Sequence, residues 1–217
     1  MALSLLRGYR DSRHVTCITM TTEAIVIPLK QFDLAKDRLR QGADLDVTAL
    51  AEELARGVLL QSRPRHVIVL SEHPDVSLFA SAAGAEVWSS RATNLNEAVQ
   101  DAYRGLADRF ERLIIVHGDL RQPEGLGDFL PEPGITIVTD HRGEGTNVLV
   151  VPTGLDFHFA YGSQSRLRHV EQAERLEVAY RVVTDSPWRF DVDELSDLKA
   201  LLTALEGAVR PPREQDS

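Results

Sequence analysis

Short runs of apolar residues alternate along this chain with longer segments in which apolar residues recur every three or four positions. The runs over 24–28, 66–70 and 113–116 are rich in valine and isoleucine and have the length of strands buried on both faces. Between them, segments 47–61 and 95–110 carry apolar residues at helical spacing. This alternation predicts a parallel sheet with helices on both of its faces.

Capping residues mark the start of both helices. Asp46 precedes the first helix, and Asn94 precedes the second, with Glu97 at the spacing of a capping pair. A further helix is expected over 75–83 and a short strand over 86–88.

The middle of the chain changes to closely spaced strand patterns, which favours antiparallel strands at one side of the sheet. The later elements expected are strands over 135–139 and 148–151, a half-buried strand over 157–161, a helix over 163–176 with Ser163 as its N-cap, a strand over 179–183 and a helix over 195–205. The predicted fold class is therefore α/β, a three-layer sandwich around a mostly parallel mixed sheet.

The length of 217 residues, of which 43% are hydrophobic, suits one substantial core. We expect a single domain over 23–208, preceded by a disordered extension over 1–22 and followed by a polar tail over 209–217. Met20 stands just before the first strand, so the sequence leaves open whether translation starts at Met1 or at Met20.

The chain is acidic, with 33 Asp and Glu against 24 Lys and Arg and a formal net charge of −9. A protein that binds nucleic acid would show a basic surface, so no nucleic-acid partner is expected. No apolar run approaches the roughly 20 residues of a membrane helix, so no membrane partner is expected either. The single cysteine, Cys17, excludes an intrachain disulfide and suits the cytoplasm.

Candidate chemistry is expected in the loops at the carboxyl ends of the strands, where ligands of such sheets bind. Lys30, Lys36 and Arg38 follow the first strand within nine residues. They could form a phosphate cradle or belong to a solvated helix face, and position alone does not decide between the two. The glycine and lysine spacing of a P-loop is absent.

Carboxylates follow two other strand-like runs. Asp119 comes directly after the third buried strand, a common position for binding magnesium and phosphate, and Gly118 would let a ligand approach the backbone. Alternatively, Asp119 caps a turn. Asp191 and Asp193 would point to opposite faces of an extended segment, so one could reach a metal while the other caps the next helix. The histidines lack the spacing of a metal site.

Two further loops could bind an anion. In 140–147, two glycines and Thr146 can offer backbone N–H groups and a hydroxyl, although a plain hairpin loop would look the same. In 161–165 the chain opens a helix, so N–H groups near Gly162 and Ser165 would face a ligand. With the two carboxylates, these loops predict a site that holds phosphates against a hard cation.

These motifs, in their order, resemble the guanylyltransferases of deazaflavin coenzyme F-420 biosynthesis, which are small relatives of the molybdenum-cofactor guanylyltransferases. The resemblance spans residues 23–205 and implies the fold of the nucleotide-diphospho-sugar transferases. The motifs that carry it are Pro28-Leu29-Lys30, Ala35-Lys36-x-Arg38-Leu39, Leu95-Asn96-x-Ala98, Gly118-Asp119-Leu120, Gly145-Thr146-Asn147, Gly162-x-x-Ser165 with Arg168-His169, and Asp191-x-Asp193.

The resemblance implies an enzyme that transfers GMP from GTP to a small phosphorylated three-carbon acid, with Mg²⁺ as cofactor and release of pyrophosphate. It favours phosphoenolpyruvate as the acceptor, or else 2-phospho-L-lactate, and it allows a homodimer. The implied roles are Asp119 and Asp191 as magnesium ligands, Lys30 and Lys36 as catalytic cations, Lys30 and Asn96 as nucleotide contacts, and Thr146, Gly162 and Ser165 as acceptor contacts.

Two other interpretations stay open. One is a nucleotidyltransferase of the same fold with another acceptor, such as a molybdopterin or a sugar phosphate, although the Leu-Ala-Gly-Gly sequence usual after the first strand of those enzymes is missing. The other is a nucleotide-binding subunit without activity, which the Arg121-Gln122 pair in place of the family's Pro-Leu leaves open. Turnover of GTP with a phospho-acid would separate both from the first interpretation.

Overall fold

The structure is a computed structural model that describes residues 23–32, 46–193 and 197–199. The extension expected over 1–22, the tail expected over 209–217 and Lys36 lie outside these ranges. Of the helix expected over 195–205, the described residues 197–199 are helical.

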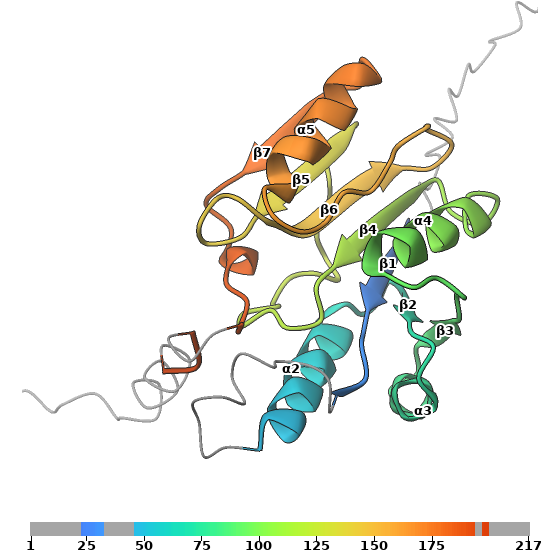
Figure 1. Ribbon diagram of the computed structural model, residues 1–217, viewed down its shortest axis with the longest axis vertical. Helices are drawn as coiled ribbons and strands as arrows, with labels where there is room; N and C mark the ends of the chain where they lie inside the picture. The colour runs from blue at the N-terminus through green and yellow to red at the C-terminus, as the bar shows by residue number, and fades with distance from the viewer. Residues whose placement is uncertain (1–22, 33–45, 194–196, 200–217) are drawn as a thin grey trace, which may run out of the picture.

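The described residues form a seven-stranded sheet with the order β3-β2-β1-β4-β6-β5-β7 (Figure 1). Strand β6 runs antiparallel to both of its neighbours, and the other four pairings are parallel. The strands are β1 (Glu23–Pro28), β2 (His66–Leu70), β3 (Glu86–Trp88), β4 (Arg112–Val116), β5 (Ile135–Thr139), β6 (Thr146–Pro152) and β7 (Tyr180–Val183). The prediction of a mostly parallel mixed sheet is confirmed.

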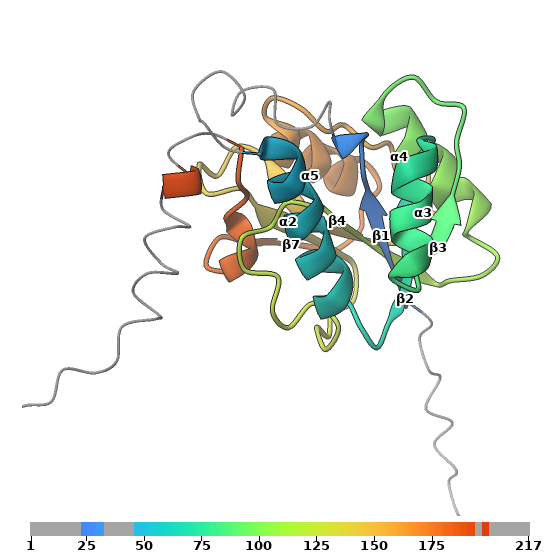
Figure 2. The same cartoon turned by 90° about the horizontal axis from the view of Figure 1, so that it is seen from below.

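Alternate residues of each central strand point into two different cores. In β1, Ala24 and Val26 face one core, whereas Ile25 and Ile27 face the other. The first core is covered by α4 (Leu95–Gly105) and α5 (Ser165–Arg175), and the second by α2 (Val47–Gln61) and α3 (Pro74–Ala82). Figure 2 shows α2 and α3 in front of the sheet and α5 behind it. The predicted three-layer sandwich is therefore confirmed.

Two helices begin where their capping residues predict. The Asp46 carboxylate accepts a hydrogen bond from the Ala49 N–H at 3.0 Å, and the Asn94 side chain accepts one from the Glu97 N–H at 3.1 Å. Glu97 in turn accepts from the Thr93 N–H at 3.2 Å, so its partner is one residue before the cap. None of the helices in the described ranges combines the length and apolar composition needed to cross a membrane.

The strand predicted over 157–161 is wrong. Its alternate residues Phe157, Phe159 and Tyr161 are buried as expected, but the segment pairs with no strand of the described sheet. Side chains of α4 bind its backbone instead: the Gln100 amide donates to the Phe157 carbonyl at 3.0 Å. Alternating burial predicted the buried side chains correctly and could not tell which groups bind the backbone.

The predicted start of the helix over 163–176 is also wrong. Helix α5 begins at Ser165, and its N-cap is Gln164, which has a left-handed backbone (φ 55°) and makes no capping hydrogen bond with its side chain. Gly162, two residues earlier, has φ 115°, a conformation that favours glycine. The chain therefore turns sharply over 162–164 before the helix begins, and Ser163 does not cap it.

Candidate active site

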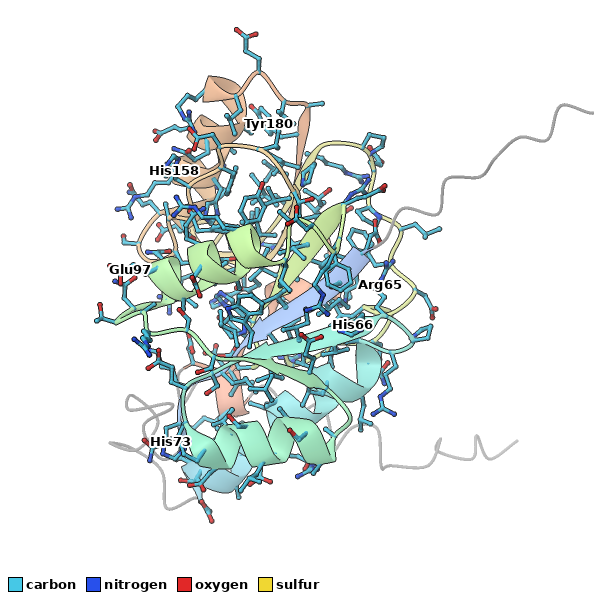
Figure 3. All side chains as sticks on the ribbon, turned by 90° about the vertical axis from the view of Figure 1, so that its right-hand side faces the viewer. Arg65, His66, His73, Glu97, His158 and Tyr180 are labelled. Carbon is cyan, nitrogen blue, oxygen red and sulfur yellow. The ribbon has the colours of Figure 1, made fainter. Side chains whose placement is uncertain are left out.

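A cleft of about 870 Å³ lies at the carboxyl ends of β1, β2 and β4. Ligands of open α/β sheets bind at this edge. Figure 3 shows this side of the molecule at His73 and Glu97, opposite Arg65 and His66 at the start of β2. The lining residues come from the ends of the strands and the loops that follow them: 28–32, 70–73, 90, 92–95 and 117–119, with Ala51, Ala98 and Asp193.

A cluster of three titratable side chains borders this cleft. His117, Asp119 and Asp191 each offer a ligand atom, and these atoms lie within 4.8 Å of one another. His117 and Asp119 follow β4 directly. Asp191 reaches them because the chain around it pairs with the residues after β4, where Leu120 and Asp191 form an antiparallel bridge. The two carboxylates predicted as metal ligands are therefore neighbours.

Two backbone hydrogen bonds hold this bridge. The Arg121 N–H donates to the Phe190 carbonyl at 2.7 Å, and the Val192 N–H donates to the Asp119 carbonyl at 3.2 Å. Val192 is fully buried, which fixes the segment to the body of the domain. The spacing of the two carboxylates is thus set by backbone contacts that a side-chain substitution would leave in place.

Electrostatic repulsion is built into this cluster. Burial, together with the negative charges of Asp119 and Asp193, raises the pKa of Asp191 to about 6, while His117 acts to lower it. The Asp191 side chain is only 12% exposed, so water screens this repulsion poorly. A bound cation would favour the ionised form.

The donor set fits a divalent cation. Carboxylate oxygens are the ligands that Mg²⁺ prefers, and an imidazole nitrogen can join them for softer ions. The Nε2 atom of His117 is buried and has no hydrogen-bond partner among the described residues. Buried polar atoms normally have a partner, so this nitrogen is consistent with a ligand or an ordered water at the cluster.

Lys30 lines the cleft from the end of β1 and is exposed. Its neighbour Leu29 is fixed by a hydrogen bond from its N–H to the Leu70 carbonyl at 3.0 Å. The Leu29 side chain fills the space beside Gly118, where an added Cβ would lie 2.2 Å from Leu29 Cδ2. Gly118 therefore makes room for Leu29 between β1 and β4, whereas the sequence had suggested room for a ligand.

The predicted acceptor residues Thr146 and Ser165 meet in a buried network around His169. Thr146 Oγ1 lies 3.1 Å from His169 Nδ1, and Ser165 Oγ lies 3.3 Å from Thr146 Oγ1. His169 Nε2 accepts a hydrogen bond from the Ala160 N–H at 3.1 Å, so the ring proton is on Nδ1 and points to Thr146. Burial, with the nearby positive groups, lowers the pKa of His169 to about 4, which keeps the ring neutral.

The start of α5 is already partly satisfied by the protein. The Ser165 N–H donates to the Gly162 carbonyl, and the Arg166 N–H donates to the Glu144 carbonyl, both at 3.1 Å. Gly162 and Ser165 are thus neighbours, as predicted. Fewer N–H groups remain for an anion at this helix start than the sequence suggested.

Asn96, predicted as a nucleotide contact, binds the backbone of Tyr161, the residue before the predicted acceptor residue Gly162. Its side chain accepts a hydrogen bond from the Tyr161 N–H at 2.6 Å and donates one to the Tyr161 carbonyl at 3.2 Å. Tyr161 in turn joins the two clusters, because its ring centroid lies 5.5 Å from that of His117 and 5.0 Å from that of His169. The amide of Asn96 is therefore engaged in positioning this tyrosine.

Sequence reasoning missed two residues near the carboxylates. His117 was set aside with the other histidines, although it stands two residues before Asp119. His141 Nδ1 lies 3.8 Å from Asp191 Oδ1, and its ring stacks on Phe190 at 6.4 Å. The signal that could have indicated His117 is its place at a strand end beside a candidate metal ligand. No such signal marks His141, because its loop meets Asp191 only in the fold.

Known proteins resemble this chain in sequence and in fold. Residues 23–210 match the family described as "Guanylyl transferase CofC like". The phosphoenolpyruvate guanylyltransferase of Roseiflexus castenholzii is 30% identical over 181 residues, which cover 80% of this chain and 84% of that protein. The 2-phospho-L-lactate guanylyltransferase of Methanocaldococcus infernus is 23% identical and covers 84% of this chain and 86% of its own. A nucleotidyl transferase from Methanothermobacter thermautotroptrophicus shares the fold, with a TM-score of 0.60 at 15% identity, over 87% of this chain and 99% of that one.

Proposed function

This chain belongs to the CofC-like guanylyl transferases, and on that premise we propose that it transfers GMP from GTP to phosphoenolpyruvate in coenzyme F-420 biosynthesis. The observation that carries the reaction type is the group His117, Asp119 and Asp191 at the border of the cleft. Two close carboxylates are poor binders of phosphates by themselves and good ligands for a cation that binds phosphates.

Asp119 and Asp191 would hold Mg²⁺ at this position. When bound, the ion would offset the negative charge of the phosphates and of the leaving pyrophosphate. A ring nitrogen of His117 lies within reach of the same ion, directly or through a water bound to the ion.

The transfer would proceed in one step. An oxygen of the acceptor's phosphate attacks the α-phosphorus of GTP, a new P–O bond forms, and the bond to the β-phosphate oxygen breaks as pyrophosphate leaves. No covalent enzyme intermediate is needed, so the chain acts mainly by placing two anions in line and neutralising their charge. Lys30, exposed in the cleft, would contact the reacting phosphates. The same role is proposed for Lys36, outside the described residues.

The acceptor would bind at Gly162, Thr146 and Ser165. His169 donates its Nδ1–H to Thr146 Oγ1 at 3.1 Å, and the Ser165 hydroxyl donates to the same oxygen at 3.3 Å. Because Thr146 Oγ1 accepts from both, the Thr146 hydroxyl keeps its own proton to donate to a carboxylate or phosphate oxygen of the acceptor. The neutral state of His169 supports this arrangement, because a second ring proton would remove the acceptor for the Ala160 N–H.

Pyrophosphate release with GTP and Mg²⁺ tests this function. The purified chain should release pyrophosphate with phosphoenolpyruvate. The comparison acceptors are 2-phospho-L-lactate and 3-phosphoglycerate. Mass spectrometry should find a product in which the phosphate of GMP and the phosphate of the acceptor form one diphosphate bridge. Silence with all three acceptors would overturn the proposed activity and favour a nucleotide-binding subunit.

The cellular setting belongs to the same proposal. We expect a cytoplasmic enzyme whose partners are GTP and a small phospho-acid, in line with the acidic charge of −9 and the single cysteine. A homodimer is a further prediction, which light scattering of the purified chain would test.

A further inference from the structure

The carboxylates that line the cleft are divided between its two ends. Glu72, Asp119 and Asp193 all line it. Asp119 belongs to the proposed metal site, and Asp193 lies close enough to raise the pKa of Asp191. Glu72 follows β2, which is separated from β4 by β1 alone. The ends of β2 and β4 are therefore two strand spacings apart, about 10 Å.

This separation matches the shape of a nucleotide. Phosphates bound at the end of β4 leave the sugar and base to extend across β1 toward β2, a distance that a nucleoside spans. The wall between the two ends is largely apolar: Pro28, Leu29, Leu70, Leu95 and Ala98 line it. Such side chains suit the flat faces of a purine, while the polar groups that select the base must meet its edge.

The loop that carries Glu72 is held on both sides. The Ser71 N–H donates to the Trp88 carbonyl at 3.1 Å, and the His73 N–H donates to Ser71 Oγ at 3.3 Å. His73 also caps α3, because its Nδ1 accepts from the Asp75 N–H at 3.3 Å. Figure 3 shows His73 at the end of α3 on the same side as Glu97. A carboxylate presented from a fixed loop loses little freedom on binding.

Glu72 itself is exposed, and its carboxylate makes no hydrogen bond or ion pair with the described residues. Its acceptor oxygens are thus open to a ligand in the cleft. We propose that Glu72 selects guanine by accepting hydrogen bonds from the N1–H and the 2-amino group of the base. The assignment rests on the proposed function, since it takes the phosphates to lie at Asp119 and Asp191.

Guanine is the common purine whose edge offers two adjacent donors to a carboxylate. Adenine presents an unprotonated N1 at the same place, which would set a lone pair against the negative charge of Glu72. Hypoxanthine, the base of ITP, keeps N1–H and lacks the 2-amino group. The three bases therefore separate the effect of each contact while the sugar and triphosphate stay the same.

Binding of GTP, ITP and ATP to the Glu72→Gln variant tests this inference, measured by calorimetry with Mg²⁺ and without an acceptor. The wild type should bind GTP more tightly than ITP, and both more tightly than ATP. The variant should bind GTP about 10- to 100-fold more weakly, because a charge-assisted pair of hydrogen bonds is lost. Its preference for GTP over ITP should shrink toward one. Its preference for GTP over ATP should also shrink, since a glutamine amide can pair with the adenine edge.

Asp75→Asn is the matched control, because this carboxylate stands three residues away, is 81% exposed, and is absent from the lining of the cleft. It should keep the wild-type affinities for all three nucleotides. Glu72→Gln should also keep the melting temperature of the wild type, as the side chain is exposed. An unchanged GTP-to-ITP ratio in Glu72→Gln would overturn the inference. If the wild type releases no pyrophosphate, the proposed function is overturned instead. The ratio of the affinities for GTP and ITP would still decide the role of Glu72.

Discussion

The two halves of the candidate site are built in opposite ways. At the carboxylate half, Asp119 and Asp191 lie close together, and burial together with the charges of Asp119 and Asp193 raises the pKa of Asp191 to about 6. At the acceptor half, Thr146, Ser165 and His169 are buried and hydrogen-bonded to one another. The charges of the first half repel each other, and a bound cation would relieve that repulsion, whereas the second half is held together by its own hydrogen bonds.

This difference predicts opposite responses to substitution. Removing a charge from the carboxylate half should cost activity and leave the fold as stable or more stable. Removing a group from the acceptor network should cost stability, because its buried partners lose their hydrogen bonds. Activity and stability together therefore distinguish a residue that binds a ligand from one that holds the scaffold.

The largest effect is expected from Asp119→Asn. The amide removes one of the two proposed metal charges, and a metal ion supplies several kcal/mol of stabilisation to the transition state. Pyrophosphate release should fall by about 1000-fold or more. Circular dichroism should show an unchanged fold, since the contact to Val192 uses the Asp119 backbone carbonyl. Turnover near the wild-type rate would remove Asp119 from the mechanism.

His169→Gln should have the next largest effect, which is a loss of stability and not of activity alone. Glutamine cannot reach both Thr146 and the Ala160 N–H, so we expect a loss of about 2–3 kcal/mol in the free energy of unfolding at pH 7. Urea unfolding would measure it.

The difference in stability between the wild type and His169→Gln should depend on pH. The folded pKa of His169, about 4, is below its unfolded value of 6.5. Its stabilising effect is therefore present above pH 6.5 and is lost as the pH falls toward 4. The wild type should lose this stability on acidification and the variant should not, so the gap between them should narrow by roughly 2–3 kcal/mol near pH 4.5. A gap that stays constant with pH would contradict a neutral buried His169.

Asp191→Asn should act in the opposite direction. The folded pKa of Asp191, about 6, exceeds its ordinary value of 3.8, so its favourable effect on stability is present below pH 3.8 and is lost as the pH rises through 6. At pH 7 without divalent ions, the neutral amide should stabilise the fold by about 1–2 kcal/mol, or about 2–8 °C in melting temperature. Added Mg²⁺ should raise the melting temperature of the wild type and not that of the variant. A variant less stable than the wild type in a chelator would show that the two carboxylates do not repel.

The fold was predictable because its strands are buried on both faces. Runs such as 67–70 and 113–116 have no polar residue to place outward, and that pattern specifies a central parallel strand. The segment 157–161 instead alternates buried and more exposed residues, as a half-buried strand would, yet it forms no strand, because side chains of α4 bind its backbone. The residue pattern predicts which side chains are buried. The hydrogen-bond partner of a backbone group depends on which element packs beside it in the fold.

The site was predictable only in part. Asp119 follows a buried strand, which is a local signal, but its meeting with Asp191 depends on the bridge between Leu120 and Asp191. The sequence indicated that pairing through the family resemblance and not through spacing. His141 reaches Asp191 from a third loop, and its place could be found only from the fold.

The smallest effect is expected from Asn96→Ala, and it decides which half of the site Asn96 serves. The resemblance implies a nucleotide contact, whereas the structure shows its amide on the backbone of Tyr161, beside His117 and His169. We expect a loss of about 1 kcal/mol in stability for the two hydrogen bonds, and a rise of a few-fold in the KM for the acceptor with the KM for GTP nearly unchanged. Gln100→Ala is the control, because Gln100 lies on the same helix as Asn96 and its amide also binds a backbone carbonyl, that of Phe157. If Asn96→Ala instead raises the KM for GTP alone, Asn96 serves the nucleotide, and Tyr161 is held in place by its buried ring.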